Sequence, residues 1–197
     1  MRAKRGLTKA AVVEAAAELL DERPGEDITL AQVAERLGVR APSLYNHVAG
    51  LDELRQAVAL AGVKELGDRI GKAAIAKAGE DALRAIAWAY RGFAKGRPGM
   101  YLATQRAPEP GETKLAEAAS EILHILGLIL APYGLDEREQ VHAIRALRSL
   151  VHGFVSLEVG GGFRMPVDLD ESFGYLIQLY VNQVTHRAFE PETSNSD

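Results

Sequence analysis

The stretch of residues 28–54 constrains the fold of this chain more than any other. Thr29 is a favourable helix N-cap, and the apolar residues behind it recur at the i, i+3, i+4 and i+7 positions of one short helix. Gly38 follows directly and can end that helix in a left-handed conformation. Pro42 suits the first turn of a second helix, which we predict over residues 41–48. Two short helices joined by a glycine turn form a helix-turn-helix unit.

The second of these helices has a polar side and an apolar side. At about 100° per residue, Leu44 and Val48 lie on one side, opposite an arc of small or hydrogen-bonding side chains. A helix that recognises base pairs in a DNA groove needs this division, because donors and acceptors must face the bases while the other side anchors the helix. The alternative is an ordinary solvated face. The polar arc consists of Pro42, Ser43, Asn46 and His47.

Charge is unevenly distributed along the chain. The net charge of −4 comes from residues 51–197, which hold 16 basic and 20 acidic side chains, whereas residues 1–50 hold 7 of each. The first nine residues carry no acid and four bases, which are Arg2, Lys4, Arg5 and Lys9. A basic arm ahead of a neutral helical head is a plausible phosphate-binding element, although a terminus that only adds solubility would look the same.

Several classes of protein are disfavoured by what the sequence lacks. The absence of cysteine excludes a disulfide framework, thiolate catalysis and cysteine-ligated metal. No two histidines have the spacing of a helical zinc site, and the glycine run at 160–162 lacks the Lys-Ser/Thr of a nucleotide-binding loop. We therefore predict no catalytic residues, no metal and no cofactor. There is no run of 18 apolar residues and no secretory signal, so we expect a cytoplasmic protein without a membrane span.

The rest of the chain also follows helical periodicity, which predicts an all-α fold. An N-terminal helix begins after the cap Thr8, a fourth helix opens at Asp52, and the weak run 71–79 is expected to be a frayed end or linker. We divide the chain into a head (1–65, with the basic arm 1–9), a helical body (66–190) and a disordered polar tail (191–197). Helices of the body are expected at 81–95, 98–104, 113–132, 136–159, where Asp136 is the predicted N-cap, and 169–189.

The last two predicted helices, 136–159 and 169–189, have more apolar surface than one packed side requires. Leu176 and Leu179 widen the arc of the last helix, and Gly153 allows close backbone approach on the other. Surplus apolar surface on adjacent helices favours a two-fold dimer over a monomer that buries both helices centrally.

An effector pocket is predicted in the body. Aromatic and polar side chains lie on consecutive short helices, and residues of later helices can face them, which is the usual composition of a small-molecule site. Each residue taken singly is better explained as ordinary core, and the prediction concerns the pocket as a whole. The candidates are Trp88, Tyr90, Phe93, Met100, Tyr101, Thr104, Leu123, Leu126, His152 and Phe154, and we expect a hydrophobic or aromatic ligand.

Over roughly residues 7–65, the head carries a set of residues with specific combined spacing: Val12-Val13, Ala15-Ala16, Leu19-Leu20, Ile28-Thr29, Val33-Ala34, Leu37-Gly38-Val39, Leu44-Tyr45, His47-Val48 and Leu54. Through these residues the head resembles the N-terminal DNA-binding domain of the TetR family of transcriptional regulators. The segment 149–155 is similar to the effector-domain signature of the WHG-type subgroup, with Val151 where the pattern usually has Trp.

This resemblance implies an Ω-shaped homodimer joined through the last two helices, and a repressor that leaves its operator when a small molecule enters the body. It implies phosphate contacts for Thr29 and Tyr45 and a phosphate or base contact for His47. Arg40 stands where the family commonly has a capping Ser, and Leu51 where it commonly has Lys. Arg40 cannot cap the third helix but can reach a phosphate or a guanine edge.

The predicted function is therefore a ligand-responsive regulator that binds double-stranded DNA. Two alternatives stay open at this stage: a helical protein-interaction module that retains the head, and a small-molecule enzyme. The predicted DNA-binding residues are Arg5, Thr29, Arg40, Ala41, Pro42, Ser43, Tyr45, Asn46 and His47.

Overall fold

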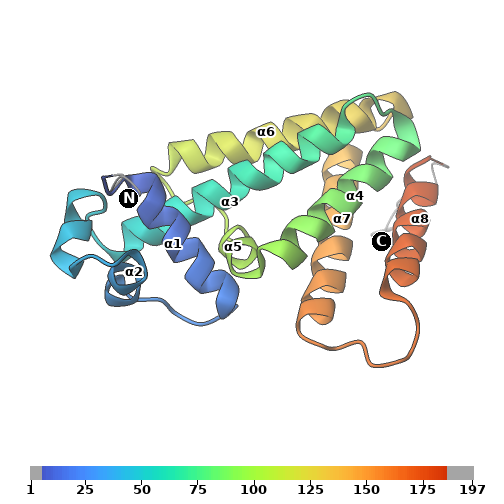
Figure 1. Ribbon diagram of the computed structural model, residues 1–197. Coiled ribbons are helices and arrows are strands. Elements are labelled where there is room, and N and C mark those ends of the chain that lie inside the picture. Colours follow the sequence, from blue (N-terminus) through green and yellow to red (C-terminus); the bar gives the residue numbers. More distant parts are fainter. Residues whose placement is uncertain (1–5, 186–197) are drawn as a thin grey trace, which may run out of the picture. The chain divides into compact units, whose positions relative to one another are not determined.

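The computed structural model describes residues 6–185 and is built from helices (Figure 1). No strand occurs within those residues, so the predicted all-α class is confirmed. The elements are α1 (Lys9–Glu22), α2 (Leu30–Leu37), the 3₁₀ helix η1 (Ala41–Asn46), α3 (Leu51–Ala74), α4 (Gly79–Gly96), α5 (Pro98–Ala103), α6 (Thr113–Leu130), the 3₁₀ turn η2 (Ala131–Tyr133), α7 (Glu137–Val159) and α8 (Leu169–Thr185).

Three predicted N-caps are confirmed by hydrogen bonds. Thr8 accepts from the Ala11 N–H at the start of α1. Thr29 and Asp136 both form capping boxes at α2 and α7, in which the cap side chain and the third helical residue satisfy each other's backbone N–H. Each box fixes where its helix begins, because it satisfies N–H groups that have no partner within the helix.

Two predicted boundaries are wrong. The helix expected over 41–48 is a 3₁₀ helix that ends at Asn46, because the Leu44 carbonyl accepts the N–H groups of both His47 and Val48 and closes the turn. The linker predicted over 71–79 is shorter than expected: α3 continues to Ala74 in spite of Gly71, and only residues 75–78 separate it from α4. The predicted tail 191–197 and the end of the last helix lie outside the described residues.

The chain forms two compact units that do not follow its order. One contains the residues up to 68 together with 92–121, and the other contains 69–91 together with the residues from 122 onward. Helices α3, α4 and α6 therefore each contribute to both units. In the first unit the core is formed by side chains of at most 1% exposure, including Val12, Ala16, Val33, Leu44, Val48, Leu54, Val58, Phe93 and Met100.

Within the first unit, α5 is fixed against the end of α1. A Cβ atom on Gly99 would lie 2.1 Å from the carbonyl carbon and oxygen of Leu20, so only glycine fits there. The Arg97 Nε donates to the Asp21 carboxylate at 2.5 Å, and the Met100 N–H donates to the other Asp21 oxygen at 2.9 Å. A close backbone contact and a shared carboxylate thus hold the two helices together.

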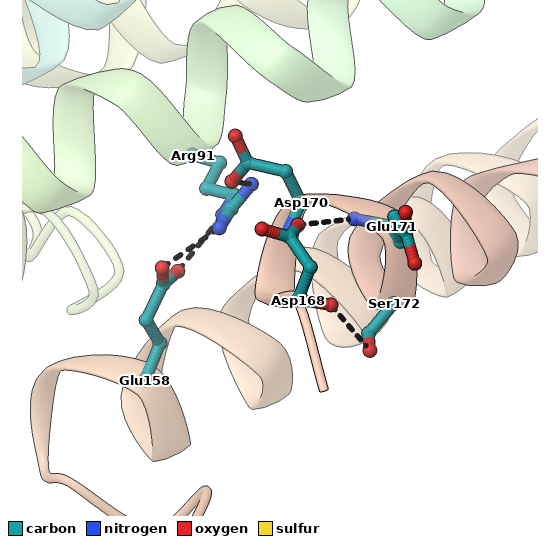
Figure 2. A network of polar contacts seen from close by, with 6 residues as sticks. All are labelled: Arg91, Glu158, Asp168, Asp170, Glu171 and Ser172. Carbon is teal, nitrogen blue, oxygen red and sulfur yellow. Dashed lines mark hydrogen bonds and ion pairs between the residues drawn. The ribbon is translucent and has the colours of Figure 1, made fainter. Parts of the chain in front are cut away.

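Within the second unit, α7 and α8 form an antiparallel hairpin joined by residues 160–168 (Figure 1). Arg91 of α4 anchors its joined end, as Figure 2 shows. The guanidinium donates twice to Glu158 of α7, at 2.8 and 2.7 Å, and lies 2.8 Å from a carboxylate oxygen of Asp170 on α8. The side chains of Arg91 and Glu158 are only 2% and 8% exposed, whereas that of Asp170 is 68% exposed.

Aromatic rings surround the same guanidinium. Its central carbon lies 5.1 Å from the ring centroid of Trp88, 5.3 Å from Phe154 and 4.8 Å from Phe173. The hydrogen bonds that Arg91 donates to the carboxylates of Glu158 and Asp170 raise its pKa above the usual value, although burial opposes them. The cation is thus held by two carboxylates inside an apolar shell, where removal of one partner strongly destabilises the fold.

Among the described residues, one helix has the length and composition of a membrane span. The segment Thr113–Tyr133 has a mean hydropathy of 1.5 over its most apolar window, of which 22% is buried. Leu115, Leu126 and Leu130 are at most 7% exposed, so one side of this helix packs within the protein. A single such helix is weak evidence for membrane insertion.

Candidate functional site

Two local features define the helix-turn-helix: a capping box at the start of α2 and a glycine turn at its end. The capping box joins Thr29 and Gln32, whose side-chain oxygen accepts the Thr29 N–H at 2.8 Å. At the other end of α2, Gly38 has φ of 66°, a left-handed conformation that glycine adopts without steric cost. The Val39 N–H then returns to the Ala34 carbonyl at 3.0 Å, which turns the chain toward η1.

The 3₁₀ form of η1 decides which side chains face outward. Leu44 and Val48 are 0% and 1% exposed and anchor the segment, whereas Tyr45 is 59% exposed. Because residues three apart are aligned in a 3₁₀ helix, Tyr45 lies over Pro42 and Asn46 over Ser43. Of the predicted residues here, Arg40, Pro42, Tyr45 and Asn46 are exposed, and Ala41, Ser43 and His47 are half-buried.

Arg40 differs in its pairing from the other described arginines of the head. Lys9, Arg23, Arg36 and Arg55 each form an ion pair with a carboxylate of the head. Arg40 is exposed and forms no ion pair with any residue in the described range 6–185. It also makes no side-chain capping bond, as predicted. A guanidinium in this state is the natural group to meet a phosphate or a base edge.

The predicted basic arm is only partly described. Arg5 lies outside the described residues. Lys9 does not project freely, because its ammonium group pairs with Glu53 at the start of α3. The same carboxylate accepts the Ala49 N–H, and these two interactions lower the pKa of Glu53, the backbone hydrogen bond more than the lysine.

The ten predicted effector residues fall in both compact units. In the first unit, the rings of Phe93 and Tyr101 meet edge to face at 6.4 Å. Thr104 is buried, and its hydroxyl donates to the Tyr101 carbonyl at 2.7 Å, so its donor is already engaged. Met100 is buried beside them.

In the second unit, the predicted residues differ widely in burial. Tyr90, Leu126 and Phe154 are buried and His152 is half-buried, whereas Leu123 and Trp88 are 52% and 38% exposed.

Two further residues organise this aromatic group. Phe173 lies 5.0 Å from Trp88 and 5.1 Å from Phe154, between ring centroids, and so joins them. Its place on the apolar side of the last helix predicts packing but not these partners. The three rings surround Arg91, for which the sequence gives no signal, because a single arginine on a helix normally indicates a solvated face.

The comparisons with known proteins now decide the family. The protein-family model described as "Tetracyclin repressor-like, C-terminal domain" matches residues 83–180 of this chain. The chain is 32% identical over 183 residues to the HTH-type transcriptional regulator YobS of Bacillus subtilis, covering 92% of this chain and 95% of that protein. The chain belongs to the TetR family of transcriptional regulators. It is thus a member of a family of regulators and not of enzymes, as the sequence predicted.

Solved TetR structures share its fold. The regulator SCO7222, a TetR protein from Streptomyces coelicolor, aligns with a TM-score of 0.71 at 24% identity and covers 91% of this chain and 98% of its own. The regulator FadR of Bacillus subtilis, solved in complex with stearoyl-CoA, aligns with a TM-score of 0.69 at 17% identity and covers 87% and 97%. The matched C-terminal region of this TetR regulator includes the signature-like segment 149–155.

Proposed function

We propose that this regulator is a repressor that binds operator DNA through η1 and leaves it when a hydrophobic or aromatic effector binds. The proposal that η1 binds DNA rests on one observation. Arg40 is an exposed cation without an ion pair among the described residues, and it lies beside the outward-facing Tyr45 and Asn46. Leu44 and Val48 hold this surface in place from below. The protein would act in the cytoplasm, where its DNA target lies.

The test is binding to duplex fragments that cover the DNA upstream of the regulator's own gene. We expect Arg40→Ala, Tyr45→Ala and His47→Ala each to weaken binding about 5- to 150-fold, because each removes a contact worth about 1–3 kcal/mol. Fluorescence anisotropy would measure the affinity, and circular dichroism would confirm that the fold is intact.

Arg23→Ala is the matched control, because it removes the same charge from an exposed, ion-paired arginine outside η1. We expect its affinity to fall less than threefold. If Arg40 contacts phosphate, its loss should also reduce the slope of log K against log salt by about 0.9. Unchanged affinity in the Arg40, Tyr45 and His47 variants would show that η1 is not the segment that contacts DNA.

The effector is proposed to be apolar because the candidate residues are mainly aromatic and aliphatic. That FadR, a protein of the same fold, was solved with an acyl-CoA is consistent with such a ligand. We expect fatty acyl and aromatic compounds to raise the melting temperature, since a ligand at 100 times its Kd stabilises the protein by about 2.7 kcal/mol. The same compounds should dissociate the DNA complex. A screen in which only highly polar compounds bind would contradict this proposal.

Repression and release require two heads held together, so we propose a homodimer through α7 and α8. Both helices carry exposed apolar side chains, notably Leu157 on α7 and Tyr175 and Leu179 on α8. A Cβ on Gly153 of α7 would meet nothing within 4 Å in its own chain, which leaves room for a partner helix.

The proposed response to ligand is a shift between two states of this dimer. Two copies of η1 would enter successive major grooves when they are roughly 34–36 Å apart. The effector would move α3, which contributes to both compact units, and so change that spacing. It must bind the released state more tightly, because equal affinity for both states shifts nothing.

A further inference from the structure

A hollow of about 280 Å³ lies between the first half of α7 and the last turns of α8. Its walls are more apolar than polar: Leu135, Ala146 and Val184 line it together with Glu139 and His142. Tyr180 also lines it, and the hydroxyl of this tyrosine donates to the Ala143 carbonyl at 3.1 Å, so the phenol is already satisfied within the chain. Ala146 is exposed, so the hollow opens toward solvent.

The outward side of α8 carries two large apolar residues one turn apart. Tyr175 is 70% exposed and Leu179 is 50% exposed, although most other large apolar residues of this helix are buried. Apolar side chains at i and i+4 form a continuous strip on a helix surface. The hairpin thus exposes both an apolar strip and a hollow.

We propose that the hollow receives the partner subunit's Tyr175, with the two-fold axis crossing α8 at Leu179. This inference rests on the proposed homodimer and specifies its register. A two-fold interface is self-complementary, so a projecting group on one subunit must meet a recess on the other. Tyr175 is the projecting group, and the hollow between α7 and α8 is the recess.

The positions along α8 agree with this register. If the two copies of α8 cross antiparallel at Leu179, then Tyr175, four residues before the axis, lies level with Gln183, four residues after it. Gln183 and Val184 line the hollow. Each of these two residues lies about 6 Å along the helix from the axis, so no axial offset separates them. The partner subunit's Leu179 would then pack directly on Leu179.

Charge favours the antiparallel arrangement. The charged side chains of α8 within its described length are both acidic, Asp170 and Glu171. The exposed charged residues of α7 are one acid and three bases, of which Arg138 lies in its first turns. An antiparallel partner brings its Glu171 to the level of Arg138, whereas a parallel partner would place the two acidic helix starts together.

Other axis positions leave apolar surface without a match. An axis at Tyr175 would set Leu179 opposite the partner subunit's Glu171. An axis midway between Tyr175 and Leu179 would pair these two residues but would bring the partner subunit's Glu171 to the hollow, where Glu139 already supplies a carboxylate. Only the axis at Leu179 fills the hollow with an aromatic ring and gives Glu171 a cation.

Because the chain contains no cysteine, single-cysteine variants give an unambiguous test. Only a residue near the axis lies within the Cα–Cα limit of about 7 Å for a disulfide with its own copy. We expect Leu179→Cys to form a covalent dimer under mild oxidation, and Tyr175→Cys not to. Leu128→Cys, on α6 at 61% exposure, is the control for collisional cross-linking.

Dimer affinity provides the second readout. We expect Tyr175→Ala to raise the dimer Kd about 30-fold or more in sedimentation equilibrium, as for a buried aromatic anchor, with Tyr175→Phe close to wild type. Leu128→Ala should leave the dimer Kd unchanged. Glu171→Lys should weaken the dimer, and adding Arg138→Glu in the same chain should restore it.

The outcomes separate this register from the dimer itself. If the wild-type protein is a monomer at micromolar concentration, both the proposed dimer and this register are wrong. If it is a dimer in which Leu179→Cys fails to cross-link and Tyr175→Ala has no effect, the register alone is overturned. Efficient cross-linking through Tyr175→Cys instead of Leu179→Cys would also overturn it.

Discussion

Replacing Glu158 with alanine should lower the free energy of unfolding by about 3 kcal/mol, the scale for removing one partner of a buried ion pair. The variant leaves the Arg91 guanidinium, only 2% exposed, without its two strongest hydrogen bonds. Asp170 compensates in part, but its side chain is 68% exposed and its field is screened by water. Urea unfolding at pH 7 would measure the difference.

Asp170→Asn is the matched control, because it removes a carboxylate from the same arginine at an exposed position. We expect it to cost less than about 1 kcal/mol. Arg91→Met combined with Glu158→Leu should be less damaging than Glu158→Ala alone, since no buried charge is then left without a partner. A loss below 1 kcal/mol for Glu158→Ala would show that the pair does not stabilise the hairpin.

Replacing Gly99 with alanine should destabilise the protein by about 3 kcal/mol, at the upper end of the cost of overpacking. The added methyl would lie 2.1 Å from the Leu20 backbone, which cannot rotate away as a side chain can. Helix α5 would have to move off α1, and the hydrogen bonds from Arg97 and Met100 to Asp21 would weaken with it.

Two other glycines serve as comparisons, because an added Cβ would meet fewer obstacles there. A Cβ on Gly62 would lie 2.7 Å from a methyl of Thr104 and 2.9 Å from a side-chain carbon of Met100, and these groups can adjust, so Gly62→Ala should cost less. Gly92 has nothing within 4 Å, so Gly92→Ala should be neutral or stabilise α4 by about 0.5–1 kcal/mol. Any other order of urea midpoints would contradict the contact as described.

The features predicted well from the sequence are those whose signal lies within a few residues. Thr29 and Asp136 were identified as caps because the groups they satisfy are three residues away. Gly38 was identified because the helix before it and the apolar residue after it are adjacent in the chain. The helix-turn-helix needs little else to be recognised.

The features that were missed depend on distant partners. Arg91 meets Glu158 at a separation of 67 residues, and Arg97 meets Asp21 at 76, so no local pattern marks either arginine as buried. The 3₁₀ form of η1 was missed for another reason. Pro42 and a buried Leu44 are compatible with both helix types, and the choice depends on how the Leu44 carbonyl is shared.

The interleaving of the two compact units has a practical consequence for building chimeric regulators. A head excised at residue 65 or 68 would lose α5 and the start of α6, which belong to the same unit. The end of α1 would then lose its close backbone neighbour, and Asp21 its guanidinium. To test η1 as the proposed DNA-contacting segment in such chimeras, transplanting only its side chains preserves this unit, whereas joining gene fragments at residue 65 or 68 divides it.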